Sequence, residues 1–142
     1  IMTLCPAQQH DADLIYRIKH EAYAAYAIQS RGSWDEAFQR RYTSENLPNT
    51  QLLLIDEKPV GWIAVRIDSH ALDVLDIHIL PSHQRQGIGT SVLRRVLQDA
   101  SVLRKRIKLS VLKINPSRSL YERLGFCVTG QTESHWLMEH EG

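Results

Sequence analysis

The sequence has few cysteines, little net charge and no long apolar run, and each absence excludes a class of protein. Two cysteines, Cys5 and Cys127, are too few for a disulfide framework, and neither lies in a spacing typical of a metal site. A net charge of +1 creates no strong field for nucleic acid or an anionic membrane. No stretch approaches the roughly 18 apolar residues of a membrane span, and no signal-peptide core is present. These features predict a cytoplasmic protein without a metal, membrane or nucleic-acid partner.

Length and composition predict one globular domain. The chain has 142 residues, of which 43% are hydrophobic and 23% are charged. Such values are typical of soluble globular proteins, and a chain of this length can bury a core without disulfides or metal. Because no linker, repeat or low-complexity tract interrupts the sequence, we expect a single domain over residues 1–142.

Hydrophobic periodicity predicts a mixed α/β protein. The pattern indicates strands at 2–6, 52–55, 60–67, 72–80 and 106–112, with two more strands after Gly125. It indicates helices at 11–29, 33–45, 88–103 and 117–124, the last one capped by Gly125. The turn 56–59 joins the second and third strands, which with the fourth form an antiparallel meander.

Local signals refine the helices. Ser33 and Glu36 form a capping box for the second helix. The stripes expected to face the core are Leu14, Ile18, Ala22 and Ala25 in the first helix and, in the helix 88–103, Ile88, Val92, Val96 and Leu103, widened by Leu93, Leu97 and Ala100.

Residues 77–90 form an apolar strand end, a loop with two glycines and the start of the long helix. The loop reads Gln84-Arg85-Gln86-Gly87-Ile88-Gly89-Thr90. The first N–H groups of a helix lack internal partners and the helix dipole is positive there, so this order predicts a phosphate site. Walker and three-glycine dinucleotide patterns are absent. A glycine pair at a strand-to-helix turn is also explained by plain turn chemistry.

A second segment follows this loop in a specific order. A strand at 108–112 leads to Asn115-Pro116 and then to Leu120-Tyr121-Glu122-Arg123-Leu124-Gly125-Phe126. Together the two motifs resemble the GCN5-related N-acetyltransferase (GNAT) superfamily over residues 72–130. Residues 10–46 correspond in outline to the variable acceptor-side region of such enzymes. The resemblance implies a single-domain α/β fold with a mixed, mostly antiparallel sheet of about seven strands flanked by about four helices.

The resemblance also implies an activity and roles for named residues. It implies transfer of an acetyl group from acetyl-CoA to a primary amine by direct attack in a ternary complex. Residues 84–90 match the loop that holds the coenzyme pyrophosphate. The backbone of Ile77, His78 and Ile79 lies along the pantetheine and supplies an oxyanion donor. Asn115 matches a residue that bonds the coenzyme arm, and Tyr121 matches the acid that protonates the thiolate.

Each of three side chains also has a structural explanation. Tyr121, beside Leu120 and Leu124 on a short helix, can be a packing residue. Asn115 before a proline can cap the next helix, alone or together with a coenzyme contact. His78 on an apolar strand can be a satisfied structural histidine.

The reaction needs a proton acceptor because an alkylamine is protonated at neutral pH. Ribosomal-protein acetyltransferases of this superfamily carry a glutamate at the position that falls on Ser110, which cannot act as a base. Asp76 is our candidate, because strand alternation puts it on one face with His78. Asp73 is expected on the other face, unless a bulge intervenes. The alternative is that Asp76 is solvated and a chain of water molecules carries the proton.

The acceptor amine is not specified by the sequence. The polar and aromatic residues of the variable regions suit a cationic amine, and capping explains the acidic ones equally well. A polyamine-like molecule, an amino-acid derivative and a protein N-terminus all stay open, as does the oligomeric state, a homodimer included. Alternative functions are a non-catalytic acyl-CoA sensor and a toxin-like acetyltransferase acting on aminoacyl-tRNA, which the scattered charge disfavours. The polar and aromatic candidates for contact with the acceptor are Tyr23, Tyr26, Trp34, Asp35, Glu36, His135 and Trp136.

Overall fold

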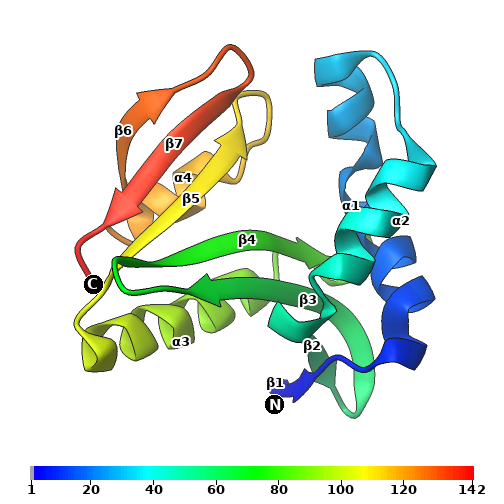
Figure 1. Cartoon of the computed structure of the whole chain (residues 1–142), viewed down its shortest axis with the longest axis horizontal. Helices are drawn as coiled ribbons and strands as arrows, with labels where there is room; N and C mark the ends of the chain where they lie inside the picture. Colours follow the sequence, from blue (N-terminus) through cyan, green and yellow to red (C-terminus); the bar gives the residue numbers. More distant parts are fainter. Residues whose placement is uncertain (1) are drawn as a thin grey trace. The chain divides into compact units, whose positions relative to one another are not determined.

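A computed structural model describes residues 2–142 as a mixed α/β protein (Figure 1). Its strands form a 7-stranded sheet in the order β1-β2-β3-β4-β5-β7-β6. The chain groups into two compact units: unit 1 contains residues up to 65 together with 76–88, and unit 2 contains 66–75 and 89–142. Strand β4 contributes residues to both units.

The order of elements follows the sequence prediction closely. The strands are β1 (Met2–Pro6), β2 (Thr50–Ile55), β3 (Lys58–Ile67), β4 (Ala71–Ile79), β5 (Arg106–Leu112), β6 (Cys127–Gln131) and β7 (His135–His140). The α-helices are α1 (Ala12–Arg31), α2 (Glu36–Glu45), α3 (Ile88–Leu103) and α4 (Arg118–Arg123). Short 3₁₀ helices are η1 (Gln9–Asp11), η2 (Leu47–Asn49) and η3 (Pro81–His83).

The sheet is mostly antiparallel, as predicted. Antiparallel ladders join β1 to β2, β2 to β3, β5 to β7 and β6 to β7. A parallel ladder joins β4 to β5 at Ala71–Asp73 and Arg106–Lys108. The turn between β2 and β3 uses Asp56 and Glu57, both with positive φ. Two left-handed residues in a row match the right-handed twist of a hairpin, which keeps this connection short.

In unit 1, helices α1 and α2 lie side by side (Figure 1). Helix α1 ends where Gly32 adopts φ +87° and donates its N–H to Ile28, a left-handed C-terminal cap. Trp62 on β3 is 1% exposed and donates its indole N–H to the carbonyl oxygen of Ile15 at 3.0 Å. This bond ties the buried face of α1 to the strand.

Two sequence predictions for these helices were wrong. Ala25 of the expected α1 stripe is exposed, and the buried positions are Ile15, Tyr16, Ile18, Lys19, Ala24 and Ala27. The buried face of α1 is rotated relative to the predicted stripe because Lys19, although polar, has a partner inside unit 1. The N-cap of α2 is Asp35, whose carboxylate accepts from the N–H of Phe38 at 3.0 Å, so Ser33 does not form the predicted capping box.

Unit 2 pairs the hairpin β6–β7 with β5, and α3 and α4 belong to the same unit (Figure 1). Helix α4 is followed by Gly125 at φ +97°, where the N–H of Phe126 bonds to the carbonyl of Tyr121 at 3.0 Å. This is the predicted glycine stop. The predicted α3 stripe is buried at Ile88, Val92, Leu93, Val96 and Ala100, but Leu103 at its end is 45% exposed.

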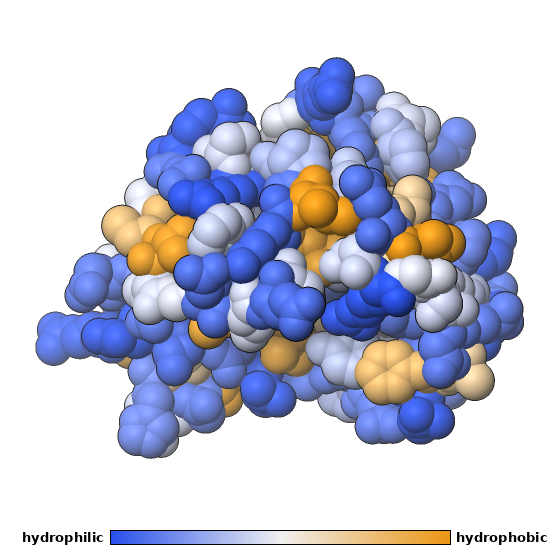
Figure 2. Space-filling view, turned by 90° about the horizontal axis from the view of Figure 1, so that it is seen from above, coloured by the Kyte–Doolittle hydropathy of each residue, from blue (hydrophilic) through white to orange (hydrophobic). Residues whose placement is uncertain are grey.

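Exposed apolar side chains are dispersed. On the face drawn in Figure 2, apolar residues form small groups separated by hydrophilic ones. No helix among residues 2–142 combines the length and hydropathy needed to cross a bilayer.

Gly61 in β3 provides a test of packing in unit 1. A Cβ atom at this position would collide with the carbonyl oxygen of His78 and lie 3.2 Å from the Cα of Ile79. Both are backbone atoms and cannot swing away. We expect Gly61→Ala to lower the free energy of unfolding by about 1–3 kcal/mol, measured by urea denaturation. Gly130→Ala is the control, since its new methyl would meet only the flexible end of Leu137, and an equal loss in both variants would contradict this packing.

Candidate active site

The loop after β4 is held in shape by glutamine side chains. Gln84 donates its amide N–H to the carbonyl oxygen of Ile79 at 2.9 Å, and Gln86 donates to the carbonyl of Ser82 at 3.3 Å. Arg85 and Gly87 adopt left-handed backbone conformations, with φ of +62° and +81°. These contacts turn the chain sharply from the end of β4 into α3.

The backbone of this loop fits an anion. Among residues 2–142, no loop or turn hydrogen bond is donated by the N–H of Arg85, Gln86, Gly87 or Ile88. No atom lies within 4 Å of a Cβ built on Gly87, so the space beside it is open. Four consecutive amides at a helix start, beside open space, can bind phosphate oxygens. The residues present therefore fit the coenzyme pyrophosphate that the sequence motif predicts.

A buried cluster of charged and polar side chains joins strand β4 to helix α1 in unit 1. The ammonium of Lys19 on α1 is 3.0 Å from Oδ2 of Asp76, and Nε2 of His78 is 3.0 Å from Oδ1. The side chains of Lys19, Asp76 and His78 are 5%, 17% and 7% exposed. The structure thus confirms that Asp76 and His78 share a strand face and adds a lysine that bonds the same carboxylate.

The surroundings of Asp76 favour its ionised form. Burial by itself raises the pKa of this carboxyl, but the charge and hydrogen bond of His78, and then those of Lys19, outweigh burial and lower the pKa below 3.8. Nearby, burial first and the Asp76 charge second raise the pKa of the Tyr23 phenol, against a smaller opposing effect of Arg31. At neutral pH the cluster therefore contains a carboxylate and an un-ionised phenol.

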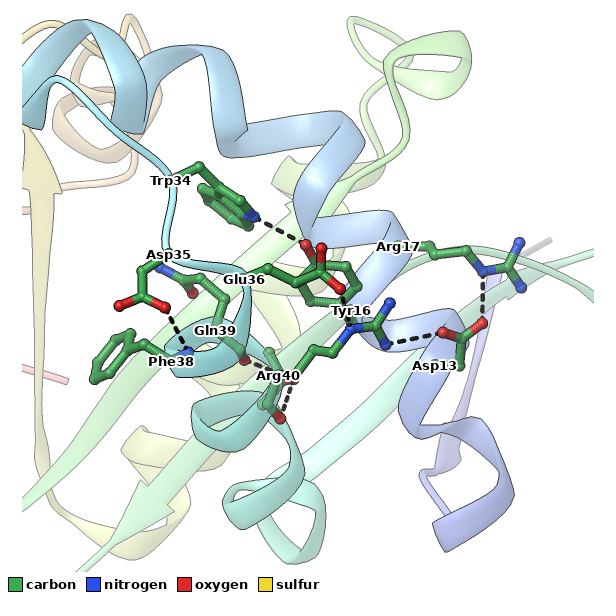
Figure 3. A network of polar contacts seen from close by, with 10 residues as sticks. Asp13, Tyr16, Arg17, Trp34, Asp35, Glu36, Phe38, Gln39 and Arg40 are labelled. Atoms are coloured by element: carbon green, nitrogen blue, oxygen red, sulfur yellow. Dashed lines mark hydrogen bonds and ion pairs between the residues drawn. The ribbon is translucent and has the colours of Figure 1, made fainter.

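Aromatic side chains of α1 meet Trp34 in unit 1, and Figure 3 shows its contact with Tyr16. Trp34, in the segment between α1 and α2, donates its indole N–H to the hydroxyl of Tyr16 at 2.9 Å. Its ring meets His20 edge-on at 5.4 Å and Tyr23 at 6.5 Å between centroids. Trp34 and Tyr23, both acceptor candidates from the sequence, are thus brought together.

Polar contacts explain the two acidic acceptor candidates. The guanidinium of Arg40 lies 4.0 Å from the Tyr16 ring centroid and bonds Glu36 at 2.9 Å and Asp13 at 3.0 Å (Figure 3). Asp35 caps α2. Glu36 and Asp35 therefore have structural partners on α2.

In unit 2 the predicted coenzyme residue Asn115 lies just before α4, and Tyr121 lies on it. The Asn115 side-chain oxygen accepts from the N–H of Ser117 at 2.9 Å, which makes Asn115 part of the turn into the helix. Tyr121 is 6% exposed and packs edge-on against Phe126. Asp73 pairs with Arg66 at 3.3 Å. Trp136 lies within cation–π distance of Lys113 and Arg118, at 4.7 and 4.6 Å.

The sequence matches the family model described as Acetyltransferase (GNAT) family over residues 14–126. The chain belongs to this family. No curated protein sequence matches it. Membership identifies the loop 84–90 and the segment 108–126 as parts of a GNAT acetyltransferase domain.

Solved structures share the GNAT fold at low sequence identity. The PaiA N-acetyltransferase from Thermoplasma acidophilum, in complex with coenzyme A, superposes with a TM-score of 0.80 at 16% identity, covering 100% of this chain and 99% of that one. An acetyltransferase from Thermus thermophilus gives 0.78 at 21% identity, with 98% and 96% covered. The ribosomal-protein-S18-alanine N-acetyltransferase from Escherichia coli gives 0.75 at 19% identity, with 98% and 92% covered.

Sequence reasoning missed two residues of this GNAT protein. Lys19 looks like an ordinary helix lysine, and its only signal is that it lies four residues from both Ile15 and Tyr23. Gln39 on α2 is 6% exposed, and its Oε1 is the one buried side-chain oxygen or nitrogen without a partner among residues 2–142. No group of three or more His, Cys, Asp or Glu side chains in that range is placed to hold a metal ion.

The Lys19–Asp76 pair predicts a pH dependence of stability. Because the folded-state pKa of Asp76 is lowered, the unfolded chain binds more protons at acidic pH, and the contribution of the pair is lost as pH falls below about 4. We expect Asp76→Asn to cost about 3–5 kcal/mol at about pH 7, since it leaves Lys19 without its counter-charge, and clearly less at about pH 3. Urea denaturation at both pH values measures this difference.

Asp13→Asn is the matched control for this pH effect. Hydrogen bonding to Arg40 lowers the pKa of Asp13 as well, but its side chain is 62% exposed. Solvent screens such pairs, so this variant should leave the pH dependence nearly unchanged. An Asp76→Asn cost that is the same at both pH values would refute the pair's electrostatic role.

Proposed function

We propose that this GNAT protein transfers the acetyl group of acetyl-CoA to a primary amine, with residues 1–142 acting as one N-acetyltransferase domain. The observation that carries the proposal is the loop 84–88, where the N–H groups of residues 85–88 donate no loop or turn bond among residues 2–142 and the left-handed Gly87 borders open space. The coenzyme A complex of the Thermoplasma acidophilum PaiA structure supports it. When bound, acetyl-CoA supplies an activated acyl carbon and a thiolate leaving group.

The chain's own residues hold the coenzyme in this proposal. Backbone amides of residues 84–90 bind the pyrophosphate, and the backbone of Ile77, His78 and Ile79 runs along the pantetheine and donates to the carbonyl oxygen of the thioester. Asn115 has its oxygen committed to Ser117, which leaves its amide N–H groups to donate to the coenzyme arm.

Tyr121 is the proposed acid for the departing sulfur. A tyrosine phenol ordinarily keeps its proton at neutral pH, and the thiolate needs one to leave as a thiol. The position of Tyr121 in the Leu-Tyr-x-x-x-Gly-Phe motif supports this role.

Asp76 is proposed to support proton removal from the amine. Both carboxylate oxygens already accept bonds, from His78 and Lys19, and the low pKa of the group makes it a weak base by itself. Asp76 therefore acts through a neighbouring group. The amine itself enters from the acceptor-side helices, where Tyr23 and Trp34 offer aromatic faces to a cation.

Gly87→Ala tests the coenzyme loop. The added methyl meets no atom, but alanine at φ +81° is strained by about 1 kcal/mol, which displaces the amides. We expect the affinity for acetyl-CoA to fall by about tenfold, measured by calorimetry. Gly32→Ala carries the same strain at φ +87° in equally open space at the end of α1, and its affinity should not change. Equal affinities of both variants would refute the loop's role.

Tyr121→Phe tests the acid. Removing only the hydroxyl should keep the fold and the acetyl-CoA affinity while turnover drops by roughly 10²- to 10⁴-fold, followed as thiol release over a panel of amines and peptides. Full turnover of Tyr121→Phe would mean that Tyr121 is a packing residue and not the acid. Coenzyme binding without turnover of any amine by the unmodified chain would instead favour an acyl-CoA sensor.

A further inference from the structure

The two ring nitrogens of His78 have different environments. Nε2 lies 3.0 Å from Oδ1 of Asp76. An ionised carboxylate only accepts hydrogen bonds, so in the neutral imidazole the proton belongs on Nε2 and the lone pair on Nδ1. The hydrogen bond thereby selects one tautomer.

Nδ1 of His78 is open. It takes part in none of the hydrogen bonds found among residues 2–142, and the only fully buried side-chain nitrogen or oxygen without a partner in that range is Gln39 Oε1. Nδ1 therefore reaches accessible space, although the histidine as a whole is 7% exposed. The basic nitrogen is therefore the one without a protein partner, whereas the other nitrogen is bonded to Asp76.

The ring is also fixed in orientation. Trp62 on β3 packs edge-on against it at 5.0 Å between centroids, and Tyr23 on α1 packs at a tilt at 5.2 Å. The carboxylate that orients it is anchored in turn by Lys19, whose ammonium is 3.0 Å from Oδ2. Lys19, Asp76 and His78 thus form a chain of contacts, called here the Lys–Asp–His chain, that ends in an open basic nitrogen on the acceptor-helix side of β4.

We propose that Nδ1 of His78 is the general base that takes the proton from the acceptor amine, with Asp76 and Lys19 as positioning residues. This inference rests on the proposed function. The amine N–H proton moves to Nδ1, the amine nitrogen forms its bond to the acetyl carbon, and the carbon–sulfur bond breaks with its electron pair on sulfur. The sulfur takes a proton from Tyr121, and proton exchange with solvent then returns the imidazolium and the phenolate to their starting states.

The arrangement explains why a carboxylate with a low pKa serves this site. Asp76 remains charged and so stabilises the imidazolium that forms when Nδ1 accepts the proton. The groups that contact His78 are Asp76 on β4, Tyr23 on α1 and Trp62, which does not titrate. Lys19 on α1 bonds Asp76 and lies over the Tyr23 ring. Because the base works only while Nδ1 is unprotonated, kcat/KM should rise with pH until the imidazole is neutral.

The kinetic test uses His78→Gln, which keeps a polar side chain of similar reach without a base. We expect its kcat to fall roughly 10²- to 10⁴-fold, its acetyl-CoA affinity to stay unchanged in calorimetry, and the ascending limb of the pH profile to disappear. His78→Gln/Asp76→Asn should lose little more than His78→Gln alone, since residues that act as a unit are not additive. His70→Gln, an exposed histidine outside the site, should behave like the unmodified chain.

A second readout does not depend on activity. Long-range ¹H–¹⁵N correlation spectra of the unmodified chain, with His78 assigned by its loss in His78→Gln, should show the proton of the neutral ring on Nε2. In Lys19→Met the population of this tautomer should fall. A proton on Nδ1, or an ascending pH limb retained by His78→Gln, would overturn the proposal. If no amine is acetylated although the tautomer is as expected, the proposed function is wrong. The catalytic role of His78 is then wrong as well, although its hydrogen bonding is as described.

Discussion

Lys19 and Asp76 form an ion pair inside unit 1, and the arrangement of the neighbouring side chains depends on it. A charged group removed from water costs several kcal/mol unless a partner compensates it, so each residue lowers the cost of burying the other. The pair fixes one face of α1 against β4. Tyr23, one turn further along α1, is thereby placed against His78, and the polar cluster acquires its shape.

The loop after β4 obeys a different constraint, which is backbone conformation. Left-handed residues at positions 85 and 87 turn the chain within a few residues, and glutamine side chains bond carbonyls on the same segment. The amides that this geometry leaves without protein acceptors are the functional groups of the loop. In the proposed function, the main chain of this loop therefore binds the anion, and no charged side chain is needed for it.

The acceptor side is built from aromatic rings held by polar bonds. Trp34 is fixed by its bond to Tyr16, and Tyr16 is covered by Arg40, which two carboxylates hold in place (Figure 3). The acidic residues that the sequence offered as contacts for an amine substrate instead bond to groups of helix α2. In the proposed function, the acceptor amine therefore meets ring faces and Nδ1 of His78 rather than a free carboxylate.

The sequence by itself determined the elements and much of the site. Periodicity predicted β5 at its observed bounds, glycine ended α4, strand alternation placed Asp76 beside His78, and two motifs identified the family. Tertiary structure decided that Lys19 is buried, that Ala25 is exposed and that Asp35 caps α2 in place of Ser33. The physical reason is range: periodicity records which face a side chain occupies, whereas the partner of Lys19 lies 57 residues away. Only folding brings such a partner near. The charge of that partner then allows a polar residue such as Lys19 to be buried.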